Sequence, residues 1–249
     1  MNIYSPSYKR AKEVKTHKLI PDLVYCVHEF EAGEYKAEGH KVEVIPNDIR
    51  GNLSKVRNYI LNNYIGDRGV MVDDDIEAFK RWELKEGEAK AVNIKDMTEF
   101  IECGFILCEE AGSHLWGINI IRDKGAYREY TPLSFNNYIS GSFMGFLNND
   151  IRFDESLPLK EDYDYSIMTA NKYRKLLRIN YAFMVKKDHA NIGGCADTRT
   201  IEVEQEQMKL FINKWGNRIV RIDESKKKGS KKMRVYDINP VIKIPIKGV

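Results

Sequence analysis

The sequence predicts an α/β fold in which helices flank a mixed, mostly parallel sheet, in a single domain. Short continuous apolar runs bounded by turn residues are typical of strands covered on both faces, as in parallel sheets. Segments with helical periodicity lie between these runs. The 249 residues, 43% of them hydrophobic, show no clear linker, repeat or low-complexity tract before a basic C-terminal segment. This length suffices for one continuous core.

The first 80 residues alternate strand and helix signals. Four apolar runs predict strands, at residues 2–4, 23–27, 42–45 and 69–72. A segment rich in Lys, Ala and Glu predicts a helix at 10–19, and apolar residues at helical spacing predict another at 53–64. In such a sheet, ligands bind at the carboxyl ends of the strands. No GxGxxG or Walker A motif follows the first strand, so a dinucleotide site or P-loop has no support.

The second half mixes the same two signals. Apolar runs predict strands at 105–107, 117–121, 138–147 and 181–185, and periodicity predicts helices at 162–177 and 200–215. The run at 138–147 contains Gly141 and Gly145, which indicates that another group packs closely against it.

The composition excludes several classes of protein. With 11% aromatic and 31% charged residues, the chain is typical of folded globular proteins rather than disordered ones. No run approaches the roughly 18 apolar residues that cross a bilayer, and the N-terminus lacks a signal-peptide pattern. We therefore expect a cytoplasmic protein without a membrane partner. Its four cysteines are too scattered for a disulfide framework or a zinc site.

Positive charge is concentrated near the C-terminus. Residues 221–234 sum to +5 within a total of +3, so the rest of the chain sums to −2. Clustered lysines favour a polyphosphate partner because they gain from releasing its counterions. A solvated surface loop is the alternative. The residues expected to contact nucleic acid are Lys226, Lys227, Lys228, Lys231 and Lys232.

Three adjacent carboxylates, Asp73, Asp74 and Asp75, follow the strand predicted at 69–72. They repel one another, which is costly unless a cation or solvent neutralises them. In an extended chain Asp73 and Asp75 point to the same side and Asp74 points away. This geometry suits a hard divalent cation such as Mn²⁺ or Mg²⁺, with water and phosphate oxygens completing its shell. The alternative is an acidic turn that leaves the sheet.

An apolar strand followed by Asp-x-Asp, in a chain that opens with a strand, resembles the GT-A class of nucleotide-sugar glycosyltransferases. Lys55-Val56-Arg57-Asn58 resembles the Ala-Arg-Asn helix of the family 2 enzymes, and Lys160-Glu161-Asp162 resembles their Glu-Asp signature. The resemblance implies a Rossmann-like GT-A fold and a metal-bound donor diphosphate at the Asp-x-Asp motif. It also implies that a carboxylate of the Glu-Asp signature is the catalytic base in inverting members.

Three segments together are similar to a narrower group. Residues 3–11, with Ser-Pro-Ser-Tyr-Lys-Arg, residues 70–75 and residues 161–165 resemble the TET-associated glycosyltransferases, a phage-enriched group. The resemblance spans residues 1–197 and implies transfer from a UDP-sugar to a 5-hydroxymethylpyrimidine in DNA, with 5-hydroxymethylcytosine as the expected base. If the chain is phage-encoded, it is expected in the host cytoplasm. The identity of the sugar, inversion or retention, and the oligomeric state stay open.

These arguments assign a role to each candidate residue. Asp162, beside Glu161, is expected to take a proton from the acceptor hydroxyl, and an N-cap is its alternative role. A metal on Asp75 and Asp73, completed by His189 as the resemblance implies, is expected to stabilise the leaving diphosphate. The residues expected to bind the donor are Ser5, Ser7, Tyr8, Arg10, Arg57, Asp73 and Asp74.

We therefore expect residues 1–220 to form the GT-A domain, followed by a basic tail at 221–249. Residues 1–80 are expected to bind the nucleotide sugar and residues 81–220 the acceptor. Three alternatives remain. One is a family 2-like transferase that acts on a polysaccharide or another non-DNA acceptor. The others are a metal-dependent nuclease built on the aspartates and a non-catalytic DNA-binding module.

Overall fold

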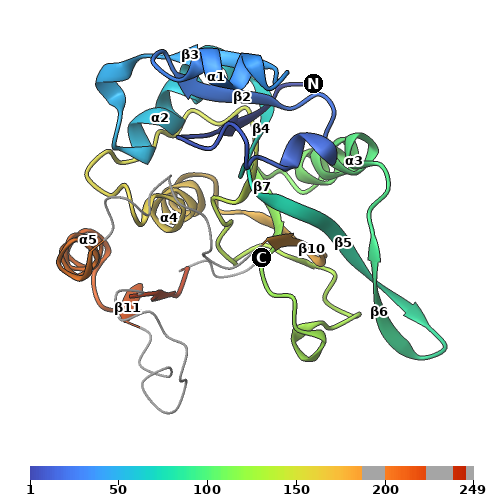
Figure 1. Ribbon diagram of the computed structural model, residues 1–249. Helices are drawn as coiled ribbons and strands as arrows, with labels where there is room; N and C mark the ends of the chain where they lie inside the picture. Colours follow the sequence, from blue (N-terminus) through green and yellow to red (C-terminus); the bar gives the residue numbers. More distant parts are fainter. Residues whose placement is uncertain (187–199, 223–237, 245–249) are drawn as a thin grey trace.

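A mixed sheet forms the centre of the protein (Figure 1). The computed structural model describes residues 1–186, 200–222 and 238–244. In these ranges a ten-stranded sheet has the order β3-β2-β1-β4-β9-β7-β10-β5-β6, and β8 pairs with β10. The strands are β1 (Ile3–Pro6), β2 (Val24–His28), β3 (Val42–Ile45), β4 (Arg68–Val72), β5 (Ile76–Lys85), β6 (Glu88–Asn93), β7 (Leu115–Asn119), β8 (Leu133–Ser134), β9 (Phe143–Leu147) and β10 (Leu177–Lys186).

Most strands of this sheet share one direction. β1 runs parallel to β2 and β4, β2 runs parallel to β3, and β7 runs parallel to β10. β9 lies antiparallel between β4 and β7. The carboxyl ends of β1, β2, β4, β7 and β10 therefore meet at one edge, together with the beginning of β9. The predicted single-domain α/β fold with a mixed sheet and flanking helices is confirmed.

Helices cover both faces of the sheet (Figure 1). In β4, Val70 and Val72 pack into one buried cluster, whereas Met71 packs into the other, so the run is buried on both sides. The first cluster includes side chains of α1 and α3, and the second includes side chains of α2 and α4. This is why the strands read as continuous apolar runs. The helices are α1 (Ala32–Ala37), α2 (Leu53–Ile60), α3 (Met97–Glu110), α4 (Glu161–Tyr173) and α5 (Ile201–Trp215).

The predicted helix at 10–19 is wrong. Only a 3-10 turn, η1 (Thr16–Lys18), forms there, and the helix between β2 and β3 is α1, which the sequence analysis missed. Backbone N–H groups of this segment form hydrogen bonds with distant residues instead of within a helix. The N–H of Arg10 donates to the Tyr35 hydroxyl, and the N–H of Lys15 donates to the Asp74 carbonyl.

The predicted strand at 105–107 is also wrong, because these residues lie in α3. The buried side chains of α3 include Phe100, Ile101, Phe105 and Cys108, which recur at helical spacing. A short apolar run is compatible with either a strand or a buried helix, and here the longer period decides. The β5–β6 hairpin was not predicted either.

The other predicted elements are present with shifted ends. The helix predicted at 53–64 is α2 continued by a π-helical turn, η3 (Leu61–Ile65), and the strand at 138–147 begins only at Phe143. α4 ends at Tyr173, and Arg174 caps it in the left-handed conformation with φ 65°. Thr200 caps α5 by accepting from the Val203 N–H, as the predicted helix at 200–215 requires.

The described parts of the C-terminal region pack on the domain. β11 (Val220–Ile222) and β12 (Pro240–Ile242) pair antiparallel, and Val220 packs in a cluster with Ile167 of α4 and Phe211 of α5. The buried Lys160 ammonium lies 2.6 Å from a Glu204 carboxylate oxygen and 2.8 Å from the Ile238 carbonyl oxygen. In the part of the chain that the structure describes, every helix is too short or too polar to span a bilayer.

Candidate active site

The three aspartates form a turn between β4 and β5 at the carboxyl edge of the sheet. Backbone hydrogen bonds hold this turn from both sides. The Asp73 N–H donates to the Ser142 carbonyl at 3.1 Å, and the Lys15 N–H donates to the Asp74 carbonyl at 2.8 Å. The Thr16 hydroxyl donates to the Asp73 carbonyl at 2.7 Å. The turn is therefore fixed by the segment after β1 and by the loop before β9.

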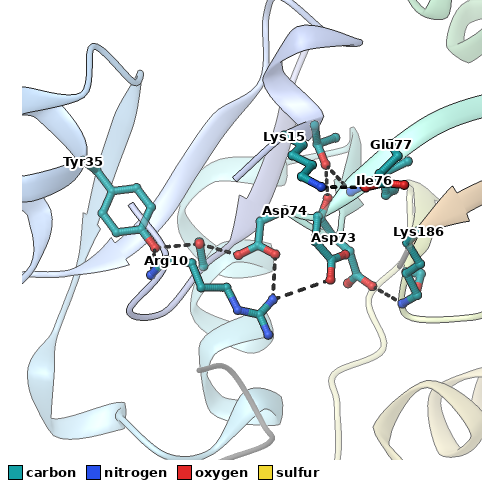
Figure 2. A network of polar contacts seen from close by, with 12 residues as sticks. Arg10, Lys15, Tyr35, Asp73, Asp74, Ile76, Glu77 and Lys186 are labelled. Atoms are coloured by element: carbon teal, nitrogen blue, oxygen red, sulfur yellow. Dashed lines mark hydrogen bonds and ion pairs between the residues drawn. The ribbon is translucent and has the colours of Figure 1, made fainter. Parts of the chain in front are cut away.

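The middle carboxylate points into the protein. Asp74 is 4% exposed, and it accepts a hydrogen bond from the Ser7 hydroxyl at 2.5 Å and one from Arg10 Nη1 at 3.0 Å. The Tyr35 hydroxyl lies 2.7 Å from the Ser7 hydroxyl. Figure 2 shows Tyr35, Arg10 and Asp74 in this network. Burial raises the pKa of Asp74 to about 6 although Arg10 opposes the shift. Asp74 thus ties the loop after β1 to the acidic turn.

The outer two carboxylates also face cations. Lys186 Nζ lies 2.9 Å from Asp73 Oδ2, and Arg10 Nη1 lies 3.7 Å from Asp75 Oδ2. Burial disfavours ionisation of Asp73, but the charges of Lys186 and Arg57 outweigh it and lower its pKa. Burial and the charge of Asp73 raise the pKa of Asp75. The charges of Asp73 and Asp75 thus influence one another. Asp74 is directed toward Ser7 and Arg10, but the three residues form a turn rather than an extended strand, so the predicted alternation does not account for this direction.

A second pair of carboxylates begins α4. Asp162 Oδ2 accepts from the Gly141 N–H at 2.9 Å, and Oδ1 accepts from the Tyr163 N–H at 2.8 Å. Lys160 is the N-cap of α4, so the alternative role of Asp162 as an N-cap is wrong. Burial and the charge of Asp162 raise the pKa of Glu161 to about 8, and burial also raises the pKa of Asp162.

Arg57 of α2 joins this pair to the loop before β9. Its guanidinium is 3% exposed, with Nη2 donating to the Gly141 carbonyl at 2.9 Å and Nε 3.6 Å from Glu161 Oε1. Its Nη1 atom is buried and has no hydrogen-bond partner among the described residues. A Cβ atom on Gly141 would lie 2.9 Å from Arg57 Nη2 and 3.4 Å from the Asp162 Cβ. The close packing predicted at Gly141 is confirmed.

Gly145 confirms the other close approach predicted on this strand. A Cβ atom there would lie 2.0 Å from Trp116 Nε1, so the indole occupies the space that a side chain would need. Trp116 is fully buried and belongs to the core.

The remaining donor-binding candidates lie on or after β1. Tyr8 is half-buried and packs edge-on against His28 and Phe30, with ring centroids 5.8 and 6.1 Å apart, respectively. Phe30 is 48% exposed and lies under the Arg50 guanidinium. Ser5 is fully buried inside β1, and its hydroxyl has no hydrogen-bond partner among the described residues. The roles of Tyr8 and Ser5 stay predictions.

The donor atoms of the acidic turn fit a hard divalent cation in part. Asp73 and Asp75 supply carboxylate oxygens, the ligand type that Mg²⁺ and Mn²⁺ prefer. Within residues 1–186, 200–222 and 238–244, no group of three His, Cys, Asp or Glu side chains has the arrangement of a metal site. A cation here would therefore depend on oxygen ligands from a substrate or from water. His189, the predicted third ligand, lies outside the described residues.

Sequence reasoning missed Lys186 and Ser142. Lys186 Nζ donates to Ser142 Oγ at 2.8 Å as well as to Asp73. Lys186 follows the apolar run predicted at 181–185, so its place at the carboxyl end of a strand was a usable signal. The five lysines predicted to contact nucleic acid, Lys226, Lys227, Lys228, Lys231 and Lys232, lie outside the described residues.

Comparison with solved structures identifies the fold as that of GT-A glycosyltransferases. Glucosyl-3-phosphoglycerate synthase from Mycobacterium tuberculosis, in complex with Mg²⁺ and UDP, matches 96% of this chain over 85% of its own, with TM-score 0.50 and 10% identity. The mannosyltransferase PcManGT from Pyrobaculum calidifontis, in complex with GDP-Man and Mn²⁺, matches 85% of this chain over 63% of its own, with TM-score 0.52 and 12% identity. The predicted GT-A fold is confirmed.

The similarity reaches only part of some of these proteins. TarS 1–349 from S. aureus, in complex with UDP, matches 86% of this chain, with TM-score 0.43 and 14% identity, and the chain spans 66% of its length. No family model matches the sequence, and a comparison with curated proteins gives no match.

Proposed function

We propose that this protein is a nucleotide-sugar-dependent glycosyltransferase that moves a sugar from a UDP-sugar to a 5-hydroxymethylpyrimidine in DNA. One observation carries the proposal. The acidic turn Asp73–Asp75 and the carboxylates Glu161 and Asp162 lie at one edge of the sheet and are joined through Gly141 and Ser142. A transferase needs both a diphosphate-binding group and a base for the acceptor, and this edge carries candidates for each.

On the donor side, Asp73 and Asp75 would hold Mn²⁺ or Mg²⁺. When bound, the metal would stabilise the negative charge that develops on the departing diphosphate. Arg10 lies beside Asp74 and Asp75 and adds a fixed positive charge at the same place. Tyr8 and the exposed Phe30 offer aromatic faces to the nucleotide base.

On the acceptor side, Asp162 takes the proton of the acceptor hydroxyl as the new bond forms. The Gly141 and Tyr163 N–H groups orient its carboxylate, and its raised pKa makes it a stronger base. Burial and the charge of Asp162 raise the pKa of Glu161, so Glu161 holds a proton more readily than an exposed glutamate does. Arg57 positions both carboxyl groups through Glu161 and Gly141.

The solved structures support the class of donor. The Mycobacterium tuberculosis synthase is in complex with UDP and Mg²⁺, and the Pyrobaculum calidifontis enzyme is in complex with GDP-Man and Mn²⁺. The DNA acceptor rests on the resemblance of three sequence segments to the TET-associated glycosyltransferases and on the basic segment 221–234. The basic segment is suited to polyphosphate binding through counterion release.

The test is direct transfer. DNA containing 5-hydroxymethylcytosine or 5-hydroxymethyluracil is incubated with the protein, Mn²⁺ and a panel of UDP-sugars, and the nucleosides are analysed by mass spectrometry. We expect a nucleoside heavier by one sugar, its absence with unmodified DNA, and its loss with Asp162→Asn. UDP release with a saccharide acceptor but never with modified DNA would favour the polysaccharide alternative. If UDP with Mn²⁺ gave no thermal stabilisation, the donor assignment would fail.

A further inference from the structure

The side chain of Lys186 occupies a central place in the site. Lys186 is the last residue of β10, where the pairing with β5 shifts register. Its ammonium lies 2.9 Å from Asp73 Oδ2 and 2.8 Å from Ser142 Oγ (Figure 2). The side chain is 38% exposed, so solvent and small ions reach this cation. The Lys186 ammonium thus has two hydrogen-bond partners among the described residues and is accessible to a cation that could replace it.

The charges around Lys186 come from the acidic turn, α4, α2 and the segment after β1. The nearest is Asp73, and Asp75 of the same turn and Asp162 of α4 act in the same direction, so together they raise the pKa of Lys186 against the effect of burial. On the cationic side, Arg10 pairs with Asp74 and Asp75, and Arg57 lies next to Glu161. Lys186 is therefore one of several cations near these carboxylates, and its ammonium is in hydrogen-bond contact with Asp73.

We propose that the Lys186 ammonium occupies a cation position at the acidic turn, so that a divalent cation held by Asp73 and Asp75 must displace it from Asp73. The inference rests on the proposed function only in taking these two carboxylates as the cation ligands. Two positive charges cannot share the turn without repulsion, so a metal alone binds weakly. A diphosphate that arrives with the metal offers Lys186 new oxygen partners, so metal and donor bind together.

The competing interpretation is a purely structural tie between β10 and the turn. In that case loss of the ammonium would lower stability and leave metal affinity unchanged or reduced. The chain offers a matched control. Lys15 has nearly the same exposure, 37%, and lies near the same turn, but its ammonium pairs with Glu77 at 2.6 Å. Replacing Lys15 removes the same charge without uncovering Asp73.

The experiment measures Mn²⁺ binding to the full chain without nucleotide, from the electron paramagnetic resonance signal of free Mn²⁺. We expect Lys186→Met to bind Mn²⁺ about tenfold more tightly than the wild type, which corresponds to about 1.4 kcal/mol. Lys186→Arg retains the charge and should bind as weakly as the wild type, as should Lys15→Met. Unchanged or weaker binding by Lys186→Met would overturn the proposal.

A second variant tests the proposal if Lys186→Met does not fold. Ser142→Ala removes one of the two hydrogen-bond partners of the ammonium, so it should tighten Mn²⁺ binding in the same direction by a smaller factor. If Ser142→Ala left Mn²⁺ affinity unchanged while Lys186→Met did not fold, the proposal would also fail. The readout needs no sugar or acceptor, so tightened Mn²⁺ binding in a protein that transfers no sugar would refute the proposed function alone.

Discussion

Arg57 Nη2 donates a hydrogen bond to the Gly141 carbonyl at 2.9 Å, which joins α2 to the loop before β9. The N–H of the same glycine donates to Asp162 at 2.9 Å. One residue thus links an arginine of the predicted donor half to the proposed base at the beginning of α4. The position of Asp162 therefore depends on the absence of a side chain at residue 141.

Gly141→Ala should lower kcat for sugar transfer by about 100-fold, because a displacement of about 1 Å at a reacting group has that effect. The new Cβ would lie 2.9 Å from Arg57 Nη2, so the arginine or the loop must move. Gly33→Ala is the control, because Gly33 lies in α1 with no atom within 4 Å of the added Cβ. Steady-state kinetics of both variants tests this. Equal kcat values for the two variants would show that Gly141 does not position Arg57 and Asp162.

Asp75→Ala should weaken UDP binding in the presence of Mn²⁺ by about tenfold or more, since even residues that only support metal ligands contribute that much. UDP binding without metal should change little. Titration calorimetry with and without Mn²⁺ measures both. Asp22→Ala removes an exposed carboxylate paired with Lys41 and serves as the control. A Mn²⁺-dependent affinity equal to that of the wild type would exclude Asp75 as a metal ligand.

Asp162→Asn should lower kcat by about 10²-fold to 10⁴-fold while leaving UDP affinity close to that of the wild type. The amide keeps the shape of the side chain but cannot accept the proton of the acceptor. Single-turnover transfer and equilibrium UDP binding, measured on the same preparation, separate the two effects. If UDP affinity fell together with kcat, Asp162 would be a donor-binding or structural residue instead.

Glu161→Gln should change how stability depends on pH. In the folded protein the pKa of Glu161 is raised from 4.5 to about 8, mainly by burial. Between these values the folded state keeps a proton that the unfolded chain releases, so this group lowers stability as pH rises. Glutamine does not titrate, so it lacks this pH dependence. Relative to the wild type, the free energy of unfolding of the variant should rise with pH, as measured by urea unfolding at pH 5, 6.5 and 8. Parallel pH curves would contradict the raised pKa.

Replacing Lys226, Lys227, Lys228, Lys231 and Lys232 by glutamine should flatten the salt dependence of DNA binding. On a duplex, the slope of log affinity against log salt decreases in magnitude by about 0.9 for each phosphate that a lysine no longer neutralises. The KM for DNA should rise, while turnover at saturating DNA stays close to that of the wild type. The control replaces exposed lysines elsewhere, at Lys36, Lys85, Lys90, Lys95 and Lys209. Equal salt slopes for the two variants would show that the five lysines of the tail do not contact DNA.

The sequence by itself determined the strands that build the site and the position of the acidic turn. The run Val70-Met71-Val72 is apolar throughout because both faces of β4 are buried, and the aspartates follow it at the edge where ligands bind. The directions of the aspartate side chains do not follow from strand alternation, because these residues form a turn in which Arg10 reaches both Asp74 and Asp75. At residues 10–19 tertiary contacts overrode the local helix signal, whereas at 105–107 the longer helical period of the sequence decided against a strand.

Only the tertiary structure decided which residues complete the site. Lys186 and Asp73 are 113 residues apart in the sequence, and Arg57 and Gly141 are 84 residues apart. Their contacts follow from the strand order β4-β9-β7-β10 and from the burial of α2 and α4 in one hydrophobic cluster, neither of which has a local signature. The surroundings of Asp162 are set in the same way, because Lys160 holds the N-cap position of α4 and the fold brings the Gly141 N–H to the carboxylate. Hydrogen bonds and charge pairs depend on distance in space, which the sheet topology sets and the spacing of residues along the chain does not.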